Sequence, residues 1–333
     1  MIIIMSNTNI KPNCILLTSR NDRLGSNFIF NLGIFLFAKI NNLKICGDMN
    51  HKYRNSIFFV NFFENIKFRS QKKYENDKNS IFVKSCDPYE FINNNDFSNQ
   101  IYTILSGMRG PILNSLYFYK QDLVSYFIEN YKSKFLEKVV NKLSKYKLPW
   151  ENNKNIIIIH IRIEDAYKRC IQTHNPCFKY IISLIDRDNL NNYNPKKRDN
   201  QSTIHYKLLK KLIIQLKNKY PDKDIYIIKK GNFYKTRINS YQPIFDKYNL
   251  KITESNNEEE DLWKMMNSDI LVLSQSTFPY MSAFYHLGSE IYYEKWSVPA
   301  CLGLGSKYDK SNWIGFPDKE TLDKIGNLRE HCK

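Results

Sequence analysis

Ile156-Ile-Ile-Ile-His160-Ile-Arg162 is the most apolar strand-like stretch of the chain, and it indicates the fold class. The stretch is too short to span a membrane, and its run of isoleucines favours an extended strand that is buried on both faces. Strands of this kind are typical of the centre of a parallel sheet that helices cover on both sides. The stretch therefore predicts an α/β fold with a parallel sheet.

Downstream of this stretch, helix-like and strand-like segments alternate. At 206–219 the apolar residues recur at helical spacing, so that one face of the segment is apolar and the other is charged. At 258–266 a run of acidic residues opens the segment, where negative charge complements the dipole of a helix. This alternation predicts βα units. The predicted elements are helices at 206–219, 237–248, 258–266 and 279–287, and strands at 224–228, 250–253, 269–273 and 290–293.

The first part of the chain shows the same order of elements. An apolar run at 14–19 predicts a buried strand, a polar turn follows at 20–25, apolar residues fall at helical spacing over 27–40, and 43–46 is again strand-like. Strand, turn, helix and strand in this order predict a βαβ unit. Residues 51–130 are rich in Phe and Tyr but show no clean period.

A break in the helical pattern near Trp150 predicts the domain boundary. Residues 133–147 form an amphipathic pattern, and the segment 148–154 then introduces proline and polar residues. Two domains also fit the length of 333 residues, at about 150 residues per domain. We expect an N-terminal domain at residues 1–150 and a C-terminal domain at residues 151–333.

Composition excludes several classes of protein. Hydrophobic residues make up 42% of the chain and aromatic residues 14%, which excludes a mainly disordered chain, and 11 Gly with 11 Pro exclude a collagen-like one. Seven scattered cysteines, an odd number, do not suggest a disulfide framework. The apolar residues 1–5 are too few for a signal-peptide core, and no run approaches the ~20 residues of a membrane span. We expect a cytoplasmic protein without a transmembrane segment.

The charge of the chain supports an alternative function. Lys and Arg number 50 against 33 Asp and Glu, and the resulting net charge of +17 is typical of proteins that bind nucleic acid. However, the basic stretches at 72–73, 196–198 and 229–230 are short and dispersed, and none of them lies in a recognisable binding motif. A non-enzymatic nucleic-acid-binding protein stays the alternative, with most of the surplus lysine interpreted as solvated surface.

Polar residues that follow the predicted strands are the candidates for function, because ligands of open α/β sheets bind beyond the carboxyl ends of the strands. His160, Arg162 and Asp165 leave the end of the apolar strand. The guanidinium of an arginine can hold a phosphate through two parallel hydrogen bonds. An ion pair between Arg162 and Asp165 that merely organises a loop explains the spacing equally well.

Two further turns hold the same position after a strand. One of them lies before a predicted helix and contains Ser274, Gln275, Ser276 and Thr277. The amides of a helix start, with hydroxyl groups beside them, can bind an anion, although an ordinary N-cap uses the same residue types. The other turn contains Arg23 and Gly25 but no Gly-x-Gly-x-x-Gly pattern, so a dinucleotide site is not indicated.

Two sequence patterns contain residue types that bind metal ions. Asp186-Arg-Asp188 follows an apolar run, and an Asp-x-Asp in that position can hold a divalent cation with a nucleotide diphosphate. The pattern recurs at 222–224 ahead of a predicted strand, as expected of a sequence that is common by chance. Three residues have an unusual spacing for zinc and no obvious fourth ligand: Cys170, His174 and Cys177. We expect no metal site, with a metal-dependent transferase using Asp186 and Asp188 as the alternative.

Three of these segments, taken in order, resemble the galactoside alpha-1,2-fucosyltransferase family, within the wider group of fucosyltransferases that share a His-x-Arg-x-x-Asp element. Leu24-Gly-Ser-Asn27 resembles the family's Leu-Gly-Asn-Gln turn, and His160-Ile-Arg162-Ile-Glu-Asp165 resembles its His-x-Arg-Arg-Gly-Asp motif. Ser276-Thr-Phe278, with the acidic helix before it, is similar to the family's C-terminal element. Ile163 and Glu164 depart from the family motif, so another nucleotide sugar stays an alternative donor.

The resemblance implies a fold, a reaction and roles for Arg162, Ser276 and Thr277, and the other site residues are expected from their positions near the strand ends. The implied fold is GT-B, with two Rossmann-like domains whose parallel sheets face a cleft. The implied reaction is inverting transfer of fucose from the donor substrate GDP-fucose to a hydroxyl of a glycan, without a metal or another cofactor. Arg162 matches the arginine that contacts the donor phosphates, and Asp165 is the second expected catalytic residue. The expected donor-binding residues are Arg23, Gly25, His160, Arg162, Ser274, Gln275, Ser276 and Thr277.

Overall fold

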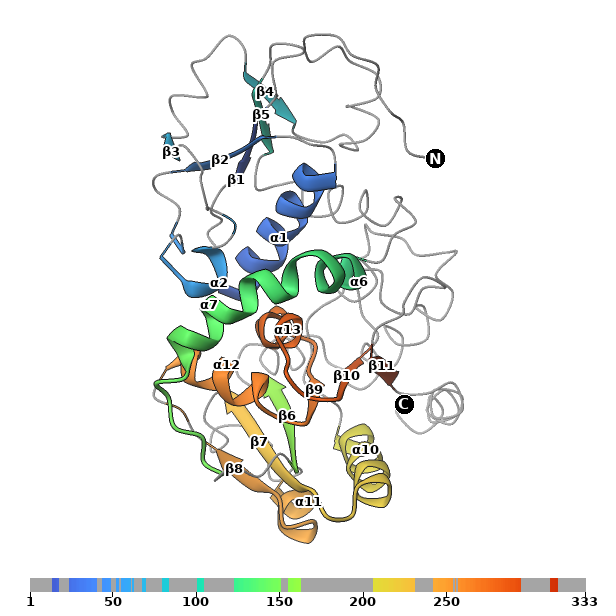
Figure 1. Ribbon diagram of the computed structural model, residues 1–333. Coiled ribbons are helices and arrows are strands. Elements are labelled where there is room, and N and C mark those ends of the chain that lie inside the picture. The colour runs from blue at the N-terminus through green and yellow to red at the C-terminus, as the bar shows by residue number, and fades with distance from the viewer. Residues whose placement is uncertain are drawn as a thin grey trace, which may run out of the picture. The chain divides into compact units, whose positions relative to one another are not determined.

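The computed structural model contains two compact units, residues 1–120 and 121–333, each with its own parallel β-sheet (Figure 1). Among the described residues, no helix is long and apolar enough to cross a membrane. The predicted α/β class with two Rossmann-like units is confirmed. The described residues are 14–17, 24–40, 44–48, 52–53, 55–60, 62, 68–69, 80–83, 101–104, 123–150, 155–162, 206–230, 242–253, 255, 257–294 and 312–316.

The sheet of the C-terminal unit has the doubly wound strand order. Its strands are β6 (Ile156–Arg162), β7 (Asp224–Lys230), β8 (Lys251–Thr253), β9 (Ile270–Leu273), β10 (Glu290–Glu294) and β11 (Trp313–Phe316). They are all parallel, and they lie in the order β11-β10-β9-β6-β7-β8. Counted along the chain, this is the strand order 3-2-1-4-5-6 read from β8, which is the order of the Rossmann fold. The stretch that indicated the fold class, β6, is therefore a central strand.

Alternate residues of the central strands pack against two helices, α10 (Tyr206–Lys219) and α11 (Gln242–Lys247). Ile157, Ile159 and Ile161 of β6 belong to one apolar cluster with the inward residues of these helices, such as Leu209 and Phe245. Because successive side chains of a strand point to opposite faces, His160 lies on the other face of the sheet. That face carries α12 (Glu258–Met266) and α13 (Thr277–Phe284), as the contact between His160 and Phe278 of α13 indicates.

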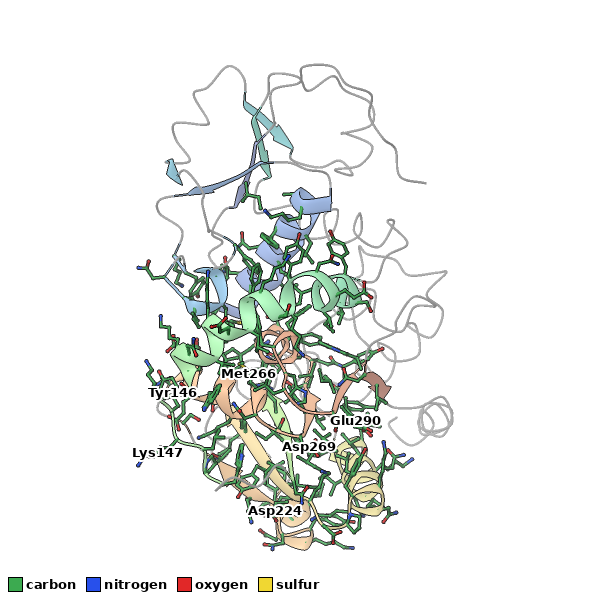
Figure 2. The ribbon with its side chains drawn as sticks, viewed as in Figure 1. Tyr146, Lys147, Asp224, Met266, Asp269 and Glu290 are labelled. Atoms are coloured by element: carbon green, nitrogen blue, oxygen red, sulfur yellow. The ribbon has the colours of Figure 1, made fainter. Side chains whose placement is uncertain are left out.

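Helical segments ahead of the sheet also belong to the C-terminal unit. They are α6 (Leu123–Phe127), the π-helical η1 (Ile128–Lys132) and α7 (Ser133–Leu143). The ring of Phe127 lies edge-on to Phe284 of α13, with centroids 5.2 Å apart. Tyr146, beyond α7, donates a hydrogen bond of 2.9 Å to Glu259 of α12 and is labelled in Figure 2. The unit thus begins at Gln121 rather than at the boundary expected near Trp150, because these helices bury their apolar side chains against α12 and α13.

The N-terminal unit contains the predicted βαβ arrangement. Its strands are β1 (Cys14–Leu17), β2 (Lys44–Asp48), β3 (Phe68–Arg69), β4 (Ser80–Val83) and β5 (Ile101–Ile104), in the parallel order β3-β2-β1-β5-β4. Two helices are described, α1 (Leu24–Ile40) and α2 (Ile57–Val60). Phe28 of α1 is fully buried against Phe58, Phe59 and Phe62, with its ring stacked on Phe62 at 5.7 Å. These aromatic residues of the unclear region 51–130 are core residues.

The predicted elements of the C-terminal unit agree closely with the structure. Helices α10 and α12 have the predicted bounds, and α13 begins at Thr277, two residues before its predicted start. The helix predicted at 237–248 is described only over Gln242–Lys247, and residues 231–241 lie outside the described residues. The strand β11 was not predicted, because Trp313-Ile-Gly-Phe316 is short and shows no alternation.

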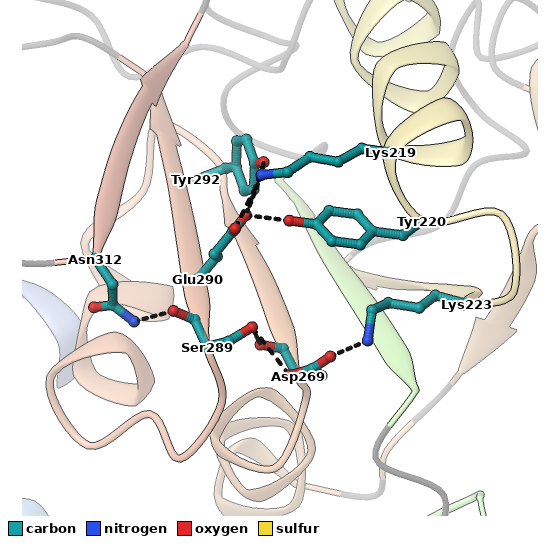
Figure 3. A network of polar contacts seen from close by, with 8 residues as sticks. All are labelled: Lys219, Tyr220, Lys223, Asp269, Ser289, Glu290, Tyr292 and Asn312. Atoms are coloured by element: carbon teal, nitrogen blue, oxygen red, sulfur yellow. Dashed lines mark hydrogen bonds and ion pairs between the residues drawn. The ribbon is translucent and has the colours of Figure 1, made fainter.

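A polar network ties the end of α10 to the amino ends of β9 and β10 (Figure 3). The carboxylate of Glu290 accepts hydrogen bonds from Lys219 Nζ at 2.9 Å, from Tyr220 Oη at 2.6 Å and from Tyr292 Oη at 2.9 Å. Lys223 forms an ion pair with Asp269 beside it. Burial alone raises the pKa of Glu290, but the hydrogen bonds from Tyr220, Lys219 and Tyr292 outweigh it and hold the pKa below its ordinary value. The network lies at the amino ends of the strands, whereas the candidate residues lie at or near the carboxyl ends.

Tyr220→Phe is expected to lower the free energy of unfolding by about 1 kcal/mol, because it removes one hydrogen bond to a partly buried carboxylate. Urea unfolding followed by circular dichroism measures this change. Tyr248→Phe is the matched control. Tyr248, like Tyr220, packs against the apolar cluster formed by β6 with α10 and α11, but its hydroxyl forms no hydrogen bond with a described residue. An equal loss of stability in both variants contradicts the role given to the Tyr220 hydroxyl.

Gly288 permits the close approach of two turns at the amino ends of β9 and β10. A Cβ atom at this position would lie 2.3 Å from the carbonyl oxygens of both Ser268 and Asp269. The turn from α13 to β10 is bonded to the turn from α12 to β9 through Leu287 N to Met266 O at 3.0 Å and Ser289 N to Asp269 O at 2.7 Å. The end of α13 is therefore fixed to the sheet by backbone contacts.

Candidate functional site

The candidate site lies at the carboxyl ends of β6 and β9. These two strands are neighbours in the sheet, with Ile159 opposite Val272. The chain leaves β6 towards α10 and β7, and it leaves β9 towards α13 and β10, so the direction of winding reverses between them. Ligands of doubly wound sheets bind in the crevice outside the strand ends at this switch point. The topology therefore selects one place on the sheet before any side chain is considered.

His160 and Ser274 meet at this switch point. The Nδ1 atom of His160 lies 2.7 Å from the Oγ atom of Ser274, at hydrogen-bond distance. His160 is 2% exposed and Ser274 is fully buried, so neither group exchanges this contact for water. The imidazole ring also faces Phe278, with ring centroids 5.9 Å apart. Two of the residues predicted to bind the donor are thus brought together although they are 114 positions apart in the sequence.

Arg162 is the last residue of β6 and is only partly buried. It follows His160 by two positions, which places both residues on the same face of the strand. Its backbone pairs with Lys230, the last residue of β7. A guanidinium at the carboxyl end of a central strand, beside buried polar groups, can bind an anion such as a phosphate.

The turn after β9 leads directly into α13. Ser276 is the N-cap of this helix, and its Oγ atom accepts a long hydrogen bond of 3.4 Å from Phe278 N. Within the turn, Ser276 N donates to the carbonyl oxygen of Ser274 at 2.7 Å. Pro279 carries no amide hydrogen, so the first turn of α13 has N–H groups only at Thr277, Phe278 and Tyr280. All four predicted residues of this turn, Ser274, Gln275, Ser276 and Thr277, are buried.

The positions of the other predicted residues differ. Arg23 and Asp165 lie outside the described residues. Gly25 belongs to the N-terminal unit and lies in the first turn of α1, which begins at Leu24, rather than in the turn before the helix. The possible metal ligands also lie outside the described residues: Cys170, His174, Cys177, Asp186 and Asp188. Within the part of the chain that is described, no three His, Cys, Asp or Glu residues gather as a metal site would require.

Sequence reasoning missed two residues at this edge. Phe278 was named only as part of the motif Ser276-Thr-Phe278 and was given no role, whereas the structure places its ring against His160. Glu294 ends β10, the next strand beyond β9, and is fully buried. The signal for Glu294 was available, because it is a carboxylate directly after the strand predicted at 290–293 and buried carboxylates are rare unless they are paired.

The far end of α13 is held by a partly buried lysine and a buried histidine. Lys132 Nζ donates a hydrogen bond of 2.6 Å to the carbonyl oxygen of His286. The Nε2 atom of His286 lies 3.1 Å from Ser268 Oγ, and Ser268 donates its own proton to Met265 O at 2.9 Å. His286 Nε2 must therefore carry the hydrogen in this contact. Burial, and then the charge of Lys132, lower the pKa of His286 to about 3, so the imidazole is neutral.

Acid is expected to destabilise the C-terminal unit through His286. The unfolded chain binds a proton at this residue below pH about 6.5, whereas the folded chain does so only near its lowered pKa, so the free energy of unfolding falls as the pH falls between these values. At pH 5 the expected loss relative to pH 7 is about 2 kcal/mol. Urea unfolding at both pH values measures this loss.

The control variant is His286→Gln, which can keep the hydrogen bond from the Nε position to Ser268 but has no titrating group. Its free energy of unfolding is expected to depend less on pH over the same range. If wild type and His286→Gln lose the same stability between pH 7 and pH 5, the loss does not come from this histidine.

The fold resembles that of several solved glycosyltransferase structures at low sequence identity. POFUT1 in complex with GDP is 12% identical, with a TM-score of 0.42, over 85% of this chain and 99% of that chain. E. coli heptosyltransferase WaaC with ADP is 9% identical, with a TM-score of 0.41, over 97% of this chain and 100% of that chain.

A mutant of Arabidopsis thaliana FUT1 in complex with GDP is 11% identical, with a TM-score of 0.40, over 87% of this chain and 72% of that chain. No protein-family model and no curated protein matches the sequence. At TM-scores of 0.40 to 0.42, these likenesses assign the chain to no family.

Proposed function

We propose that this protein is a glycosyltransferase that transfers fucose from GDP-fucose to a hydroxyl group of a glycan, with inversion and without an obligatory metal. The observation that carries the proposal is the 2.7 Å contact between His160 and Ser274 at the switch point of the sheet. It joins the two segments of the C-terminal unit that resemble fucosyltransferase motifs. Arg162 and the first turn of α13 lie at the same edge.

The proposed reaction is a direct displacement at the anomeric carbon of the donor. The oxygen of the acceptor hydroxyl forms the new bond to this carbon while the bond to the diphosphate breaks, and the electron pair leaves with the GDP. Negative charge therefore grows on the leaving phosphate. Arg162, the Thr277 hydroxyl and the amides at the start of α13 are the groups proposed to stabilise it, which is electrostatic stabilisation of a leaving group.

The acceptor hydroxyl must also lose its proton. Glu164 and Asp165 follow Arg162 within three residues and are proposed bases by position, with Asp165 as the member of the motif, and Asp22 is the third candidate. Protein cations take over the task that a divalent cation performs in metal-dependent transferases, so the proposal needs no metal.

A thermal-shift screen tests the proposal. The ligands are GDP-fucose, GDP-mannose, UDP-sugars and TDP-sugars, each with and without Mn²⁺, because a ligand that binds the folded state raises the melting temperature. Stabilisation by GDP-fucose without metal, followed by release of GDP when glycans are added, is the expected result. A strict requirement for Mn²⁺ favours the alternative site at Asp186 and Asp188. Binding of oligonucleotides with a steep salt dependence, and of no nucleotide sugar, contradicts the proposal.

A further inference from the structure

His160 links the end of β6 to the start of the turn that follows β9. Its Nδ1 atom is 2.7 Å from Ser274 Oγ, and its ring lies against Phe278 in the first turn of α13. Both polar groups are buried, with His160 2% exposed and Ser274 fully buried. The histidine therefore contacts the turn between β9 and α13 at both of its ends.

The contacts continue from Ser274 into the helix. The carbonyl oxygen of Ser274 accepts a hydrogen bond of 2.7 Å from Ser276 N, and Ser276 is the N-cap of α13. Within the described residues, Ser274 Oγ has His160 as its hydrogen-bond partner. Removing the imidazole therefore takes the side-chain anchor away from a buried serine whose backbone sets the start of the helix. A buried hydroxyl left without a partner is costly, so the turn is expected to move.

We infer that His160 is a positioning residue of the proposed donor site, acting through its Nδ1 atom on Ser274 and not by touching the donor. This inference rests on the proposed function, and it deepens it by separating the groups expected at the donor into two sets. His160 and Ser274 hold the turn in place. The turn thereby places Thr277 and the first amides of α13 so that they face the diphosphate together with Arg162.

Two substitutions at His160 separate a positioning role from a ligand role. The side-chain amide of asparagine places a polar atom at the Nδ1 position of histidine, and it can either donate to or accept from Ser274. The side-chain amide of glutamine places its polar atom at the Nε2 position instead. His160→Asn is therefore expected to preserve the contact with Ser274, whereas His160→Gln loses it.

Two measurements on the full-length protein read out the difference. The first is the dissociation constant for GDP-fucose from titration calorimetry, for which we expect a loss of about ten-fold in His160→Gln and little change in His160→Asn. The second is hydrogen exchange of the backbone amides at 274–280 without ligand, which is expected to speed up in His160→Gln alone. Melting temperatures are recorded for both variants, since a general loss of stability would lower them without this contrast.

Ser274→Ala provides the test from the other side of the hydrogen bond. It is expected to weaken donor binding and speed up exchange at 274–280 as His160→Gln does, and adding His160→Gln to it is expected to cost little more. Preserved binding in His160→Gln with loss in His160→Asn overturns the inference, because it places the Nε2 atom on the ligand. Wild-type exchange at 274–280 in Ser274→Ala overturns it as well.

Failure of the proposed function gives a different result. If the wild-type protein binds no nucleotide sugar, the proposed function is wrong, and the exchange of the amides at 274–280 still decides whether His160 positions the turn. If the wild-type protein binds GDP-fucose and the exchange rates of His160→Asn, His160→Gln and Ser274→Ala equal that of wild type, the proposed function stands and the positioning role is wrong.

Discussion

Replacing Arg162 by alanine is expected to lower turnover of GDP-fucose by about 10²- to 10³-fold, the usual effect of removing one group that stabilises developing negative charge. Arg162 ends β6 at the switch point, where it is only partly buried. The effect is expected in the rate constant more than in the fold, because the side chain lies at the edge of the sheet. Release of GDP from GDP-fucose in the presence of a glycan mixture measures it.

Two further variants make the Arg162 result specific. Arg162→Lys keeps the charge but not the planar pair of donors, and it is expected to recover only part of the activity. Lys211→Ala removes an exposed positive charge from α10, and it is expected to leave turnover unchanged. If Arg162→Ala keeps full turnover and donor affinity, or if Lys211→Ala loses as much, the assignment of Arg162 to the diphosphate is wrong.

Phe284→Ala is expected to lower the free energy of unfolding by about 3–5 kcal/mol. Phe284 is fully buried in α13, and its ring lies 5.2 Å from that of Phe127 and 5.9 Å from that of Trp313. Alanine at this position leaves a cavity between α6, α13 and β11, and the surrounding rings can collapse into it only in part. Urea unfolding followed by circular dichroism measures the loss.

Leu287→Ala is the control for the cavity, since Leu287 follows the same helix but is 47% exposed. Its free energy of unfolding is expected to change by less than about 0.5 kcal/mol. A small effect of Phe284→Ala, close to that of Leu287→Ala, would show that the packing between α6 and α13 contributes little to the stability of the unit.

Local patterns predicted the elements whose ends carry their own signals. Helix α12 begins at Glu258 because Asn257 caps it and accepts a hydrogen bond from Glu260 N at 2.9 Å, and its acidic first turn complements the helix dipole. Helix α10 has its predicted bounds because its apolar residues recur at a regular helical period. Both signals lie within a few residues of the feature that they predict.

Features that depend on distant partners could not be predicted in this way. The amphipathic pattern of α7 predicted a helix, but not that Phe135, Val139 and Leu143 would be buried in the C-terminal unit. An apolar face does not specify which surface covers it, so the proline-containing segment after α7 was interpreted as a domain boundary. The short strand β11 likewise depends on pairing with β10.

The candidate site was predicted as separate segments and not as an arrangement. His160 and Ser274 were both expected at the donor because one lies near the end of a strand and the other follows a strand, and their mutual hydrogen bond depends on the pairing of β6 with β9. That pairing follows from the strand order, which no pattern within either segment encodes. The placement of Asp165 and Arg23 near a donor stays a prediction.

The strand order also has a consequence for how the chain is made. The pairing of Ile157 with Ile270 joins β6 to a strand that is synthesised much later, and until then one edge of the mostly apolar β6 has no neighbour. Pairings between such distant residues form slowly, and unpaired apolar edges promote aggregation. A nascent chain released before Ile270 therefore exposes the β6 edge, and the two strands that carry the candidate site come together only after most of the chain has left the ribosome.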